Sequence, residues 1–211
     1  MPRASRHRPA PDSRSRIFAA AAAEFAARGY AGASVDRIAR AARLNKAMIY
    51  YHFRSKAALY RAILRDTFDA IGERARAVAA APLAPDAKVR AYIELFVQAA
   101  DARPHFAPIW LREVTDGATH VDRDTLAYAG HVLGTLAGIL REGERAGRFR
   151  PVSPALVQMS IVAPLMLFLV TGPMRRKLDR AGGRGAAALT RAQVVAHIER
   201  VTLAVLEGRI A

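Results

Sequence analysis

The feature that most constrains this fold is a pair of short helical patterns that lie only two residues apart, between Ser34 and Lys56. Apolar residues recur at intervals of three and four, the spacing of one helix face, at Val35, Ile38, Ala39 and Ala42 and then at Met48, Ile49 and Phe53. Only Arg43 and Leu44 lie between the two patterns. This is the spacing of a helix-turn-helix, whose second helix enters the major groove of DNA while the first crosses the backbone.

Polar residues at the start of each pattern can cap these helices. Ser34 precedes the first helix, Asn45 the second, and Ser55 a third that carries Leu59 and Ile63 on its apolar side. The side-chain oxygen of each capping residue can accept a hydrogen bond from a free backbone N–H of the first turn. The second helix is about two turns long, and a helix this short is not stable alone. It therefore depends on packing of its apolar face, and its first residues are exposed.

The exposed start of the second helix carries side chains that can read DNA. An Asn amide can bond an adenine edge, a Lys ammonium can reach guanine or phosphate, and small or apolar side chains can touch the thymine methyl group. The polar tips of the aromatic residues that follow can reach phosphates, and Lys56 lies at a helix N-terminus, which favours anions. The predicted DNA-contacting residues are Ser34, Arg43, Asn45, Lys46, Ala47, Met48, Tyr50, Tyr51, His52 and Lys56.

The distribution of charge points the same way. The formal net charge is +15, with 29 Arg and 4 Lys, a bias that a GC-rich genome would produce without selection for DNA binding. The distribution is more informative, since residues 1–60 hold 12 basic and 3 acidic side chains while residues 61–211 hold 21 and 15. A strongly basic N-terminal module on a milder body suits phosphate binding.

Between about residues 14 and 60 the chain resembles the DNA-binding domain of the TetR (tetracycline repressor) family. The resemblance rests on residues at the family's spacing, namely Phe25, Gly29, Tyr30, Ile38, Ala39, Leu44, Lys46, the run from Tyr50 to Phe53, Ser55, Lys56 and Leu59. The chain departs from the family in the turn, where Arg43 stands in place of the usual glycine. If this position needs a positive φ, Arg43 carries a strain of about 1 kcal/mol or more; alternatively, it adds a phosphate contact.

The whole chain is predicted to be all-α, with about nine helices. We expect a disordered basic arm over residues 1–12, either a solvated tail or a further DNA contact, a helix-turn-helix domain over 13–58, and a helical body over 59–211. The basic, glycine-rich stretch from Met174 to Leu189 is expected to be a mobile loop. The helices are expected at about 13–28, 34–42, 45–53, 56–79, 85–102, 104–114, 122–146, 153–170 and 190–207.

The resemblance implies a ligand cavity among the fourth to eighth helices of the body. An apolar, aromatic lining would suit a hydrophobic or aromatic ligand, with one polar anchor. Glu113 lies among the apolar residues of its helix, and it either bonds a neighbouring helix end or an Arg, or serves as that anchor. The candidate lining residues are Phe96, Phe106, Trp110, Glu113, Tyr128, His131 and Met166.

Two further patterns concern helix packing. Gly130, Gly134 and Gly138 share one helix face, and since each glycine costs up to about 1 kcal/mol in a helix, the face serves either close helix packing or free volume for a ligand. The segment 153–170 is apolar on nearly all sides, so part of it is expected to meet a second subunit. The resemblance implies a four-helix dimer interface from the last two long helices, with candidates Leu165, Phe168, Leu169, Val194, Ile198, Val201 and Val205.

Other functional classes find little support in the sequence. The chain has no Cys and therefore no thiolate chemistry, and no nucleotide-binding or hydrolase motif is present. His120, Asp122 and Asp124 could suggest a metal, but Asp at a helix start is common for capping reasons, so we predict no metal and no cofactor. The most apolar run, Ile161 to Val170, is far shorter than a bilayer span and contains a proline, so no membrane association is expected.

The sequence thus predicts a homodimeric transcription regulator, a repressor that a hydrophobic or aromatic small molecule releases from a palindromic DNA operator. It is expected to be cytoplasmic, nucleoid-associated and not an enzyme. Three alternatives remain open: an activator of the same fold, a non-specific basic nucleoid-binding protein, and a helical small-molecule enzyme or carrier. A regulator should prefer its operator over scrambled DNA by about 10³-fold or more, whereas a non-specific binder would not.

Overall fold

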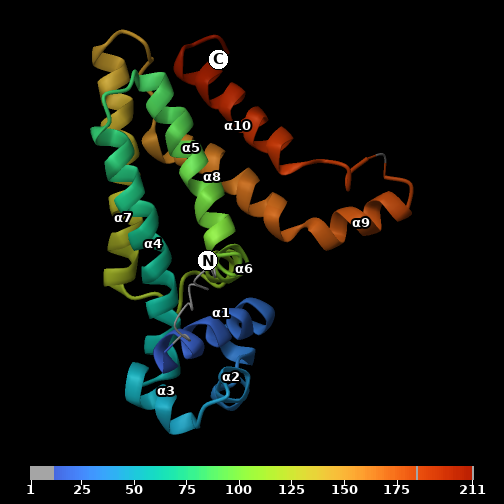
Figure 1. Cartoon of the computed structure of the whole chain (residues 1–211). Coiled ribbons are helices and arrows are strands. Elements are labelled where there is room, and N and C mark those ends of the chain that lie inside the picture. The colour runs from blue at the N-terminus through green and yellow to red at the C-terminus, as the bar shows by residue number, and fades with distance from the viewer. Residues whose placement is uncertain (1–11, 184, 211) are drawn as a thin grey trace, which may run out of the picture. The chain divides into compact units, whose positions relative to one another are not determined.

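The computed structural model describes residues 12–183 and 185–210, and this part of the chain forms ten helices and no strand (Figure 1). The predicted all-α fold is therefore confirmed, with one helix more than the roughly nine expected. Nearly all of the predicted N-terminal arm lies outside the described residues.

The chain divides into two compact units within helix α4 (Lys56–Ala80), between Ile63 and Leu64. The N-terminal unit contains α1 (Ser13–Gly32), α2 (Val35–Ala42), α3 (Lys46–Phe53) and the first residues of α4. Helix α1 packs against both α2 and α3. Its apolar centre is built from one face of each helix, with Ile17, Ala21, Phe25, Ile38, Ala39, Ile49, Phe53, Leu59 and Tyr60 buried.

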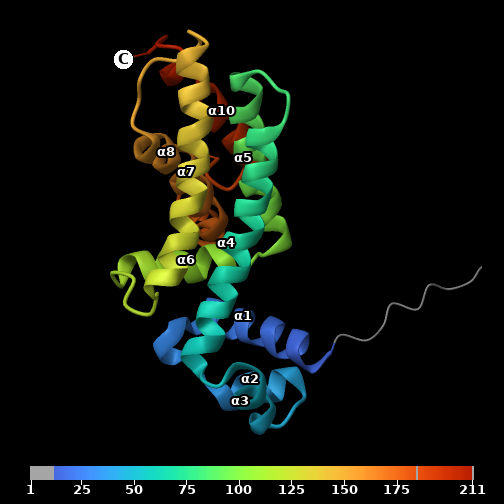
Figure 2. The same ribbon diagram turned by 90° about the vertical axis from the view of Figure 1, so that its left-hand side faces the viewer.

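The C-terminal unit contains the rest of α4 and six further helices. Helix α5 packs against α7 and α10, and α8 also packs against α7 and α10, so these four surround one core (Figures 1 and 2). That core includes Ile71, Val89, Tyr92, Ile93, Phe96, Leu136, Ile139, Ile161 and Leu165. The bounds are Pro85–Ala102 for α5, Phe106–Thr115 for α6, Arg123–Arg145 for α7, Pro154–Val170 for α8, Gly172–Arg180 for α9 and Arg191–Leu206 for α10.

Helix α9 corrects the sequence prediction, which placed a loop over 174–189. The glycines that suggested a loop, Gly182, Gly183 and Gly185, all follow the helix. Within α9, Pro173 occupies a favoured first-turn position, and the residues after it are mostly good helix formers. In the described residues no single helix is long and apolar enough to cross a membrane; α8 with α9, bent by 64°, satisfies those criteria only as a pair and only by length and composition.

The predicted caps are only partly correct. Asn45 Oδ1 accepts from Ala47 N at 2.9 Å, and Ser55 Oγ accepts from Ala58 N at 3.0 Å, as expected. Ser34 was wrongly predicted, because its side chain makes no capping bond; instead its backbone N–H donates to Glu24 Oε1 at 3.2 Å. Gly29 has φ 68° but ψ 178°, so it bends α1, and the helix continues to Gly32.

Candidate functional site

Helix α3 presents its polar residues outward because its two large apolar residues are fixed in the core. Ile49 and Phe53 are buried, and the ring centroids of Phe53 and Phe18 lie 6.4 Å apart. The opposite side is open to solvent, with Tyr51 79% exposed. Of the ten predicted DNA-contacting residues, six are exposed (Arg43, Asn45, Lys46, Ala47, Tyr50 and Tyr51) and four are half-buried (Ser34, Met48, His52 and Lys56).

The turn between α2 and α3 is built on a left-handed residue. Arg43 has φ 53° and ψ 46°, and Leu44 N donates to Ala39 O at 3.0 Å, the bonding of a Schellman-type helix end. The Arg16 guanidinium donates to the carbonyls of Ala42 (2.6 Å) and Arg43 (3.1 Å), which secures the turn from α1. Sequence reasoning missed this role of Arg16, since nothing in its own helix pattern distinguishes it from a solvated arginine.

Replacing Arg43 with glycine is expected to raise the free energy of unfolding by about 0.5–1 kcal/mol, because glycine adopts a positive φ without steric cost. The matched control is Arg40→Gly, an exposed position in the last turn of α2, which should lower it by up to about 1 kcal/mol. Urea unfolding followed by circular dichroism measures both. A loss of stability in Arg43→Gly would show that the Arg43 side chain contributes more than its backbone strain removes.

Three of the predicted DNA-contacting side chains already have partners within the N-terminal unit. Lys46 Nζ lies 2.9 Å from Asp36 Oδ1, and this hydrogen bond raises the pKa of the Lys46 ammonium. His52 Nε2 lies 2.8 Å from Ser13 Oγ. Lys56 Nζ donates to the carbonyls that end α1, Tyr30 O at 2.9 Å and Ala33 O at 3.2 Å. An ammonium has three donors, so Lys56 braces this unit and keeps one donor for an anion.

Two adjoining cavities lie within the C-terminal unit. The α5–α6 cavity, of about 470 Å³, is lined by Ala99, Asp101, Arg103, Pro104 and Ala107 among others. The aromatic cavity, of about 460 Å³, lies beside it and is lined by residues of α4 to α8, including Phe68, Trp110, Leu133, Gln158 and Met159. Both volumes suit a drug-sized ligand. Four side chains belong to both linings and form the partition, namely Ile71, Phe96, Phe106 and Met166.

The structure separates the predicted ligand-binding residues into two groups. Phe96, Phe106 and Met166 line both cavities and Trp110 lines the aromatic cavity, whereas Glu113, Tyr128 and His131 line neither. Glu113 is buried, and its carboxylate contacts His120, at 2.8 Å from Nδ1 and 3.3 Å from the backbone N. The rings of Tyr128 and His131 stack edge to face on one side of α7, with centroids 6.5 Å apart. Helical spacing predicts which face of a helix a residue lies on, but it does not predict whether that face borders a cavity.

Sequence reasoning missed Gln158 and Phe68 as cavity residues. Gln158 did carry a signal, because it and Ser160 are the only polar side chains between Pro154 and Val170. Phe68 lies at helical spacing with Leu64 and Ile71, and the sequence does not distinguish an aromatic residue of a cavity from one of the core on such a stripe. Packing within this chain does not explain the glycine stripe, since a Cβ at Gly130, Gly134 or Gly138 would meet nothing within 4 Å. Of the three, only Gly130 lines either of the two cavities.

The predicted dimer residues also divide. Leu165 and Ile198 are buried in the core of their own chain, at 1% and 2% exposed, so they leave almost no surface for a partner. Val194 is 9% exposed and lines a surface groove with Leu167 and Phe168, and its place in a dimer interface stays a prediction. Phe168, Leu169 and Val201 are half-buried and Val205 is exposed. Other apolar side chains of α8 are more exposed, with Leu156 at 65% and Leu167 at 53%. The spacing of apolar residues identified the apolar faces of these helices. It did not show which of those faces pack within the same chain and which stay exposed to a partner.

The comparisons with known proteins match both units of the chain. Residues 17–63 match the family described as bacterial regulatory proteins, tetR family, and residues 85–198 match the tetracyclin repressor-like C-terminal domain. The chain belongs to the TetR family of helix-turn-helix transcriptional regulators. The family suspected from residues 14–60 is thereby confirmed, and the match extends well beyond the DNA-binding motif.

Relatives of this TetR-family regulator include other transcription factors. It is 26% identical to the HTH-type transcriptional repressor SCO4008 of Streptomyces coelicolor over 171 residues, 81% of this chain and 85% of that protein. It is 24% identical to the HTH-type transcriptional regulator RutR of Escherichia coli, over 91% of this chain and 88% of that protein. In fold it resembles the TetR family regulator PfmR from Thermus thermophilus, with a TM-score of 0.65, 21% identity, and 93% and 97% of the two chains covered.

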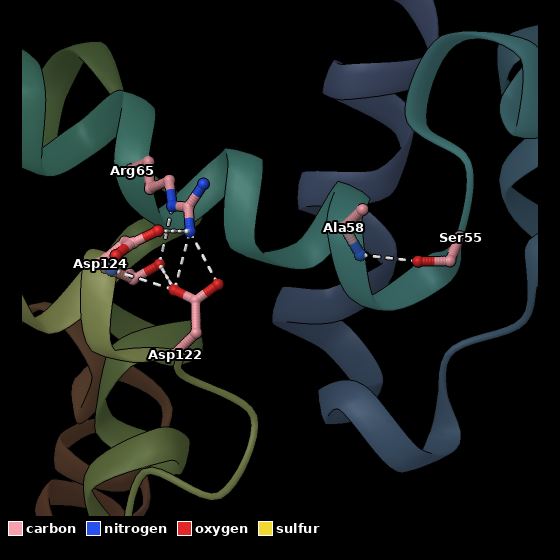
Figure 3. Close-up of polar contacts among 6 residues, drawn as sticks. Ser55, Ala58, Arg65, Asp122 and Asp124 are labelled. Carbon is pink, nitrogen blue, oxygen red and sulfur yellow. Dashed lines mark hydrogen bonds and ion pairs between the residues drawn. The ribbon is translucent and has the colours of Figure 1, made fainter.

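In this regulator, an ion pair joins α4 to the start of α7 inside the C-terminal unit (Figure 3). The Arg65 guanidinium donates to both carboxylate oxygens of Asp122 at 2.7 and 2.8 Å, and to Thr125 Oγ1 at 2.9 Å. Asp122 also caps α7 by accepting from Thr125 N at 3.0 Å. Asp122 thus caps α7 and pairs with Arg65, Asp124 lies 3.7 Å from Arg65, and His120 contacts Glu113. Within the described residues no three acidic or His side chains gather to hold a metal ion.

Replacing Asp122 with alanine is expected to lower the free energy of unfolding by about 1–2 kcal/mol, because α7 loses its cap and Arg65 its partner in a partly solvated site. Burial would raise the pKa of Asp122, but hydrogen bonds from Thr125 and Arg65 hold it well below the ordinary 3.8. Because the pKa of Asp122 is lower in the folded than in the unfolded chain, its carboxylate stabilises the fold fully at pH values well above 3.8. This contribution decreases as the pH falls below 3.8 toward the pKa of the folded state.

The measurement is urea unfolding of wild type and Asp122→Ala at pH 7, 5 and 3. The difference should be equal at the two higher values and shrink at pH 3. Asp124→Ala is the matched control, because its carboxylate is 3.7 Å from Arg65 and 82% exposed, and it should change stability by about 0.5 kcal/mol or less. Equal losses in the two variants would contradict the assignment to the Asp122 ion pair and cap.

Proposed function

We propose that this chain is a repressor that binds a palindromic operator as a homodimer and is released from it by a small molecule. The observation that carries the proposal is the exposed face of α3, held in place by the buried Ile49 and Phe53. Asn45 and Lys46 at the start of this helix have the chemistry that reads base edges. The helix is eight residues long and reads only a few base pairs, so a two-fold pair of chains would double the site.

Exposed apolar side chains support the homodimer. Leu156 and Leu167 on α8 and Val205 on α10 are exposed, and large apolar side chains exposed on neighbouring, packed helices are candidates for an interface. We propose that α8 and α10 of two chains form it. Two copies of α3 would then address half-sites about 34 Å apart.

The cavities support a small-molecule effector. Their combined lining is mainly apolar and aromatic, as in ligand pockets. Because α4 contributes residues to both units, we propose it as the helix through which ligand binding changes the spacing of the two α3 helices. A shift from 99% to 1% binding-competent protein needs a ligand preference of about 10⁴-fold for the incompetent state.

The test is a binding titration of purified protein against the DNA upstream of its own gene and against a scrambled duplex, at two salt concentrations. We expect two chains per site and a preference of about 10³-fold or more that survives the higher salt. Lys46→Ala should weaken operator binding and change the base preference. The matched control is Lys177→Ala on α9, an exposed lysine outside the DNA-binding unit, which should leave binding unchanged.

The outcomes separate the remaining alternatives. Equal binding to both duplexes, and to fragments selected from the whole genome, would indicate a non-specific nucleoid-binding protein, as the net charge of +15 would allow. Specific binding that increases transcription would indicate an activator. Ligand turnover without linkage to DNA would indicate an enzyme or carrier. We propose none of these, and we place the protein in the cytoplasm on the nucleoid, without metal or cofactor.

A further inference from the structure

The aromatic cavity has a wall of fixed rings. Phe68 stands edge-on to both Phe106 and Trp110, with ring centroids 5.3 and 5.0 Å apart and interplanar angles of 88° and 86°. The rings of Phe106 and Trp110 are nearly parallel, at 7°. Because each ring is held by the others, the wall presents flat apolar surfaces against which a ring-containing molecule can pack.

No unpaired charge faces either cavity. None of the described residues that line the aromatic cavity is charged. In the adjoining α5–α6 cavity, Arg103 is paired with Asp66, with Nε 2.8 Å from Oδ2, and Asp101 is paired with Arg191. A carboxylate or ammonium packed against the aromatic wall would lose part of its hydration without gaining an opposite charge, which is unfavourable.

One amide supplies the polar chemistry of the aromatic cavity. Gln158 Oε1 accepts the single proton of the Tyr92 hydroxyl at 2.8 Å, and the hydroxyl oxygen also lies 3.2 Å from Val132 O. Tyr92 is fully buried, and burial raises the pKa of its hydroxyl far above the usual range, so it stays a neutral donor. With its oxygen engaged, Gln158 retains its –NH₂ group, which has no hydrogen-bond partner among the described residues.

We propose that the aromatic cavity binds an uncharged, mainly apolar, ring-containing ligand whose hydrogen-bond acceptor, such as a ketone or ester carbonyl, meets the Gln158 –NH₂ group. The inference rests on the proposed function, in which the body binds a small-molecule effector, and it specifies the chemistry of that effector. It excludes free carboxylic acids, which would find no cation, and amines, which would oppose the amide N–H. Gln158 is thus the specificity-determining residue of the cavity.

The test uses four naphthalenes of nearly equal size, namely 2-acetonaphthone, 2-ethylnaphthalene, 2-naphthoate and 2-naphthylmethylammonium. Binding to the full chain without DNA is measured by calorimetry and by quenching of Trp110, the only tryptophan. The ketone should bind saturably, and the hydrocarbon roughly five- to tenfold more weakly, the effect of one hydrogen bond. The two ions should bind at least about tenfold more weakly than the ketone.

Gln158→Leu should lower the affinity for the ketone to that for the hydrocarbon, because one hydrogen bond is lost. The affinity for the hydrocarbon should change by no more than about twofold, because apolar packing is kept. Gln158→Met, closer in length, serves as the second variant should Gln158→Leu fold poorly. Gln98→Leu is the matched control, because Gln98 is an exposed glutamine of α5 that lines neither cavity, and it should retain the full ketone preference.

The outcomes for the inference and for the proposed function are distinct. No saturable ketone binding, tighter binding of either ion, or an unchanged ketone preference in both Gln158 variants would overturn the inference. Specific operator binding, measured separately, would still support the regulator. Conversely, Gln158-dependent ketone binding by a protein that shows no operator preference would support the inference and contradict the repressor.

Discussion

Replacing Glu142 with alanine is expected to lower the free energy of unfolding of the C-terminal unit by about 3 kcal/mol, because it leaves a buried ammonium without its counter-charge. Lys88 is only 5% exposed. Its Nζ donates to both carboxylate oxygens of Glu142, at 2.9 and 2.8 Å, and to Ala79 O at 2.8 Å. Without Glu142 one carbonyl would remain, and the charge would stay largely desolvated.

Replacing the other partner, Lys88, should lower the free energy of unfolding much less, although it breaks the same ion pair. In Lys88→Met the apolar stem is kept and the buried charge is removed, while Glu142, whose side chain is 44% exposed, remains hydrated. We expect a loss of about 1 kcal/mol or less. Urea unfolding followed by Trp110 fluorescence reports on this unit. A larger loss in Lys88→Met than in Glu142→Ala would show that desolvation of the ammonium is not the dominant effect.

The DNA-binding unit is the part of the molecule that sequence reasoning predicted best. Its helices are short, and their apolar residues, such as Ile38 and Ile49, recur at intervals that fix both the helix and its buried face. The backbone conformation of its turn follows largely from residues adjacent in sequence, and the positive φ that the sequence raised as a condition for Arg43 is found, at 53°. The support that Arg16 gives the turn from α1 is a contact between distant residues and was missed. Local structure of this kind depends on local sequence.

The body was less predictable because its functional features depend on contacts between distant residues. Nothing near Lys88 indicates that it is buried, since its partner Glu142 lies 54 residues away. The orientation of the Gln158 amide depends on Tyr92, 66 residues away. Leu165 and Ile198 lie on apolar faces, as predicted, but periodicity cannot say whether the same chain or a second subunit covers such a face.

Replacing Gly143 with alanine is expected to lower the free energy of unfolding by about 2–3 kcal/mol, because the added methyl group overpacks the core. A Cβ atom at this position would lie 1.9 Å from Cδ2 of Phe149, whose ring is buried. The ring cannot withdraw easily, since Phe149 N donates to Gly143 O at 3.2 Å and Arg148 N to the same oxygen at 2.9 Å. The glycine is therefore required for the close approach of Phe149 to the end of α7.

Gly138→Ala, five residues earlier in the same helix, is the matched control and should have the opposite sign. A Cβ at Gly138 meets nothing within 4 Å, so the substitution should raise the free energy of unfolding by about 0.5–1 kcal/mol through helix propensity alone. Urea unfolding at a protein concentration too low for dimers isolates this effect in the single chain. If Gly138→Ala also destabilised the protein there, the glycine face would be packed within one chain; a loss confined to high concentration would assign it to the dimer.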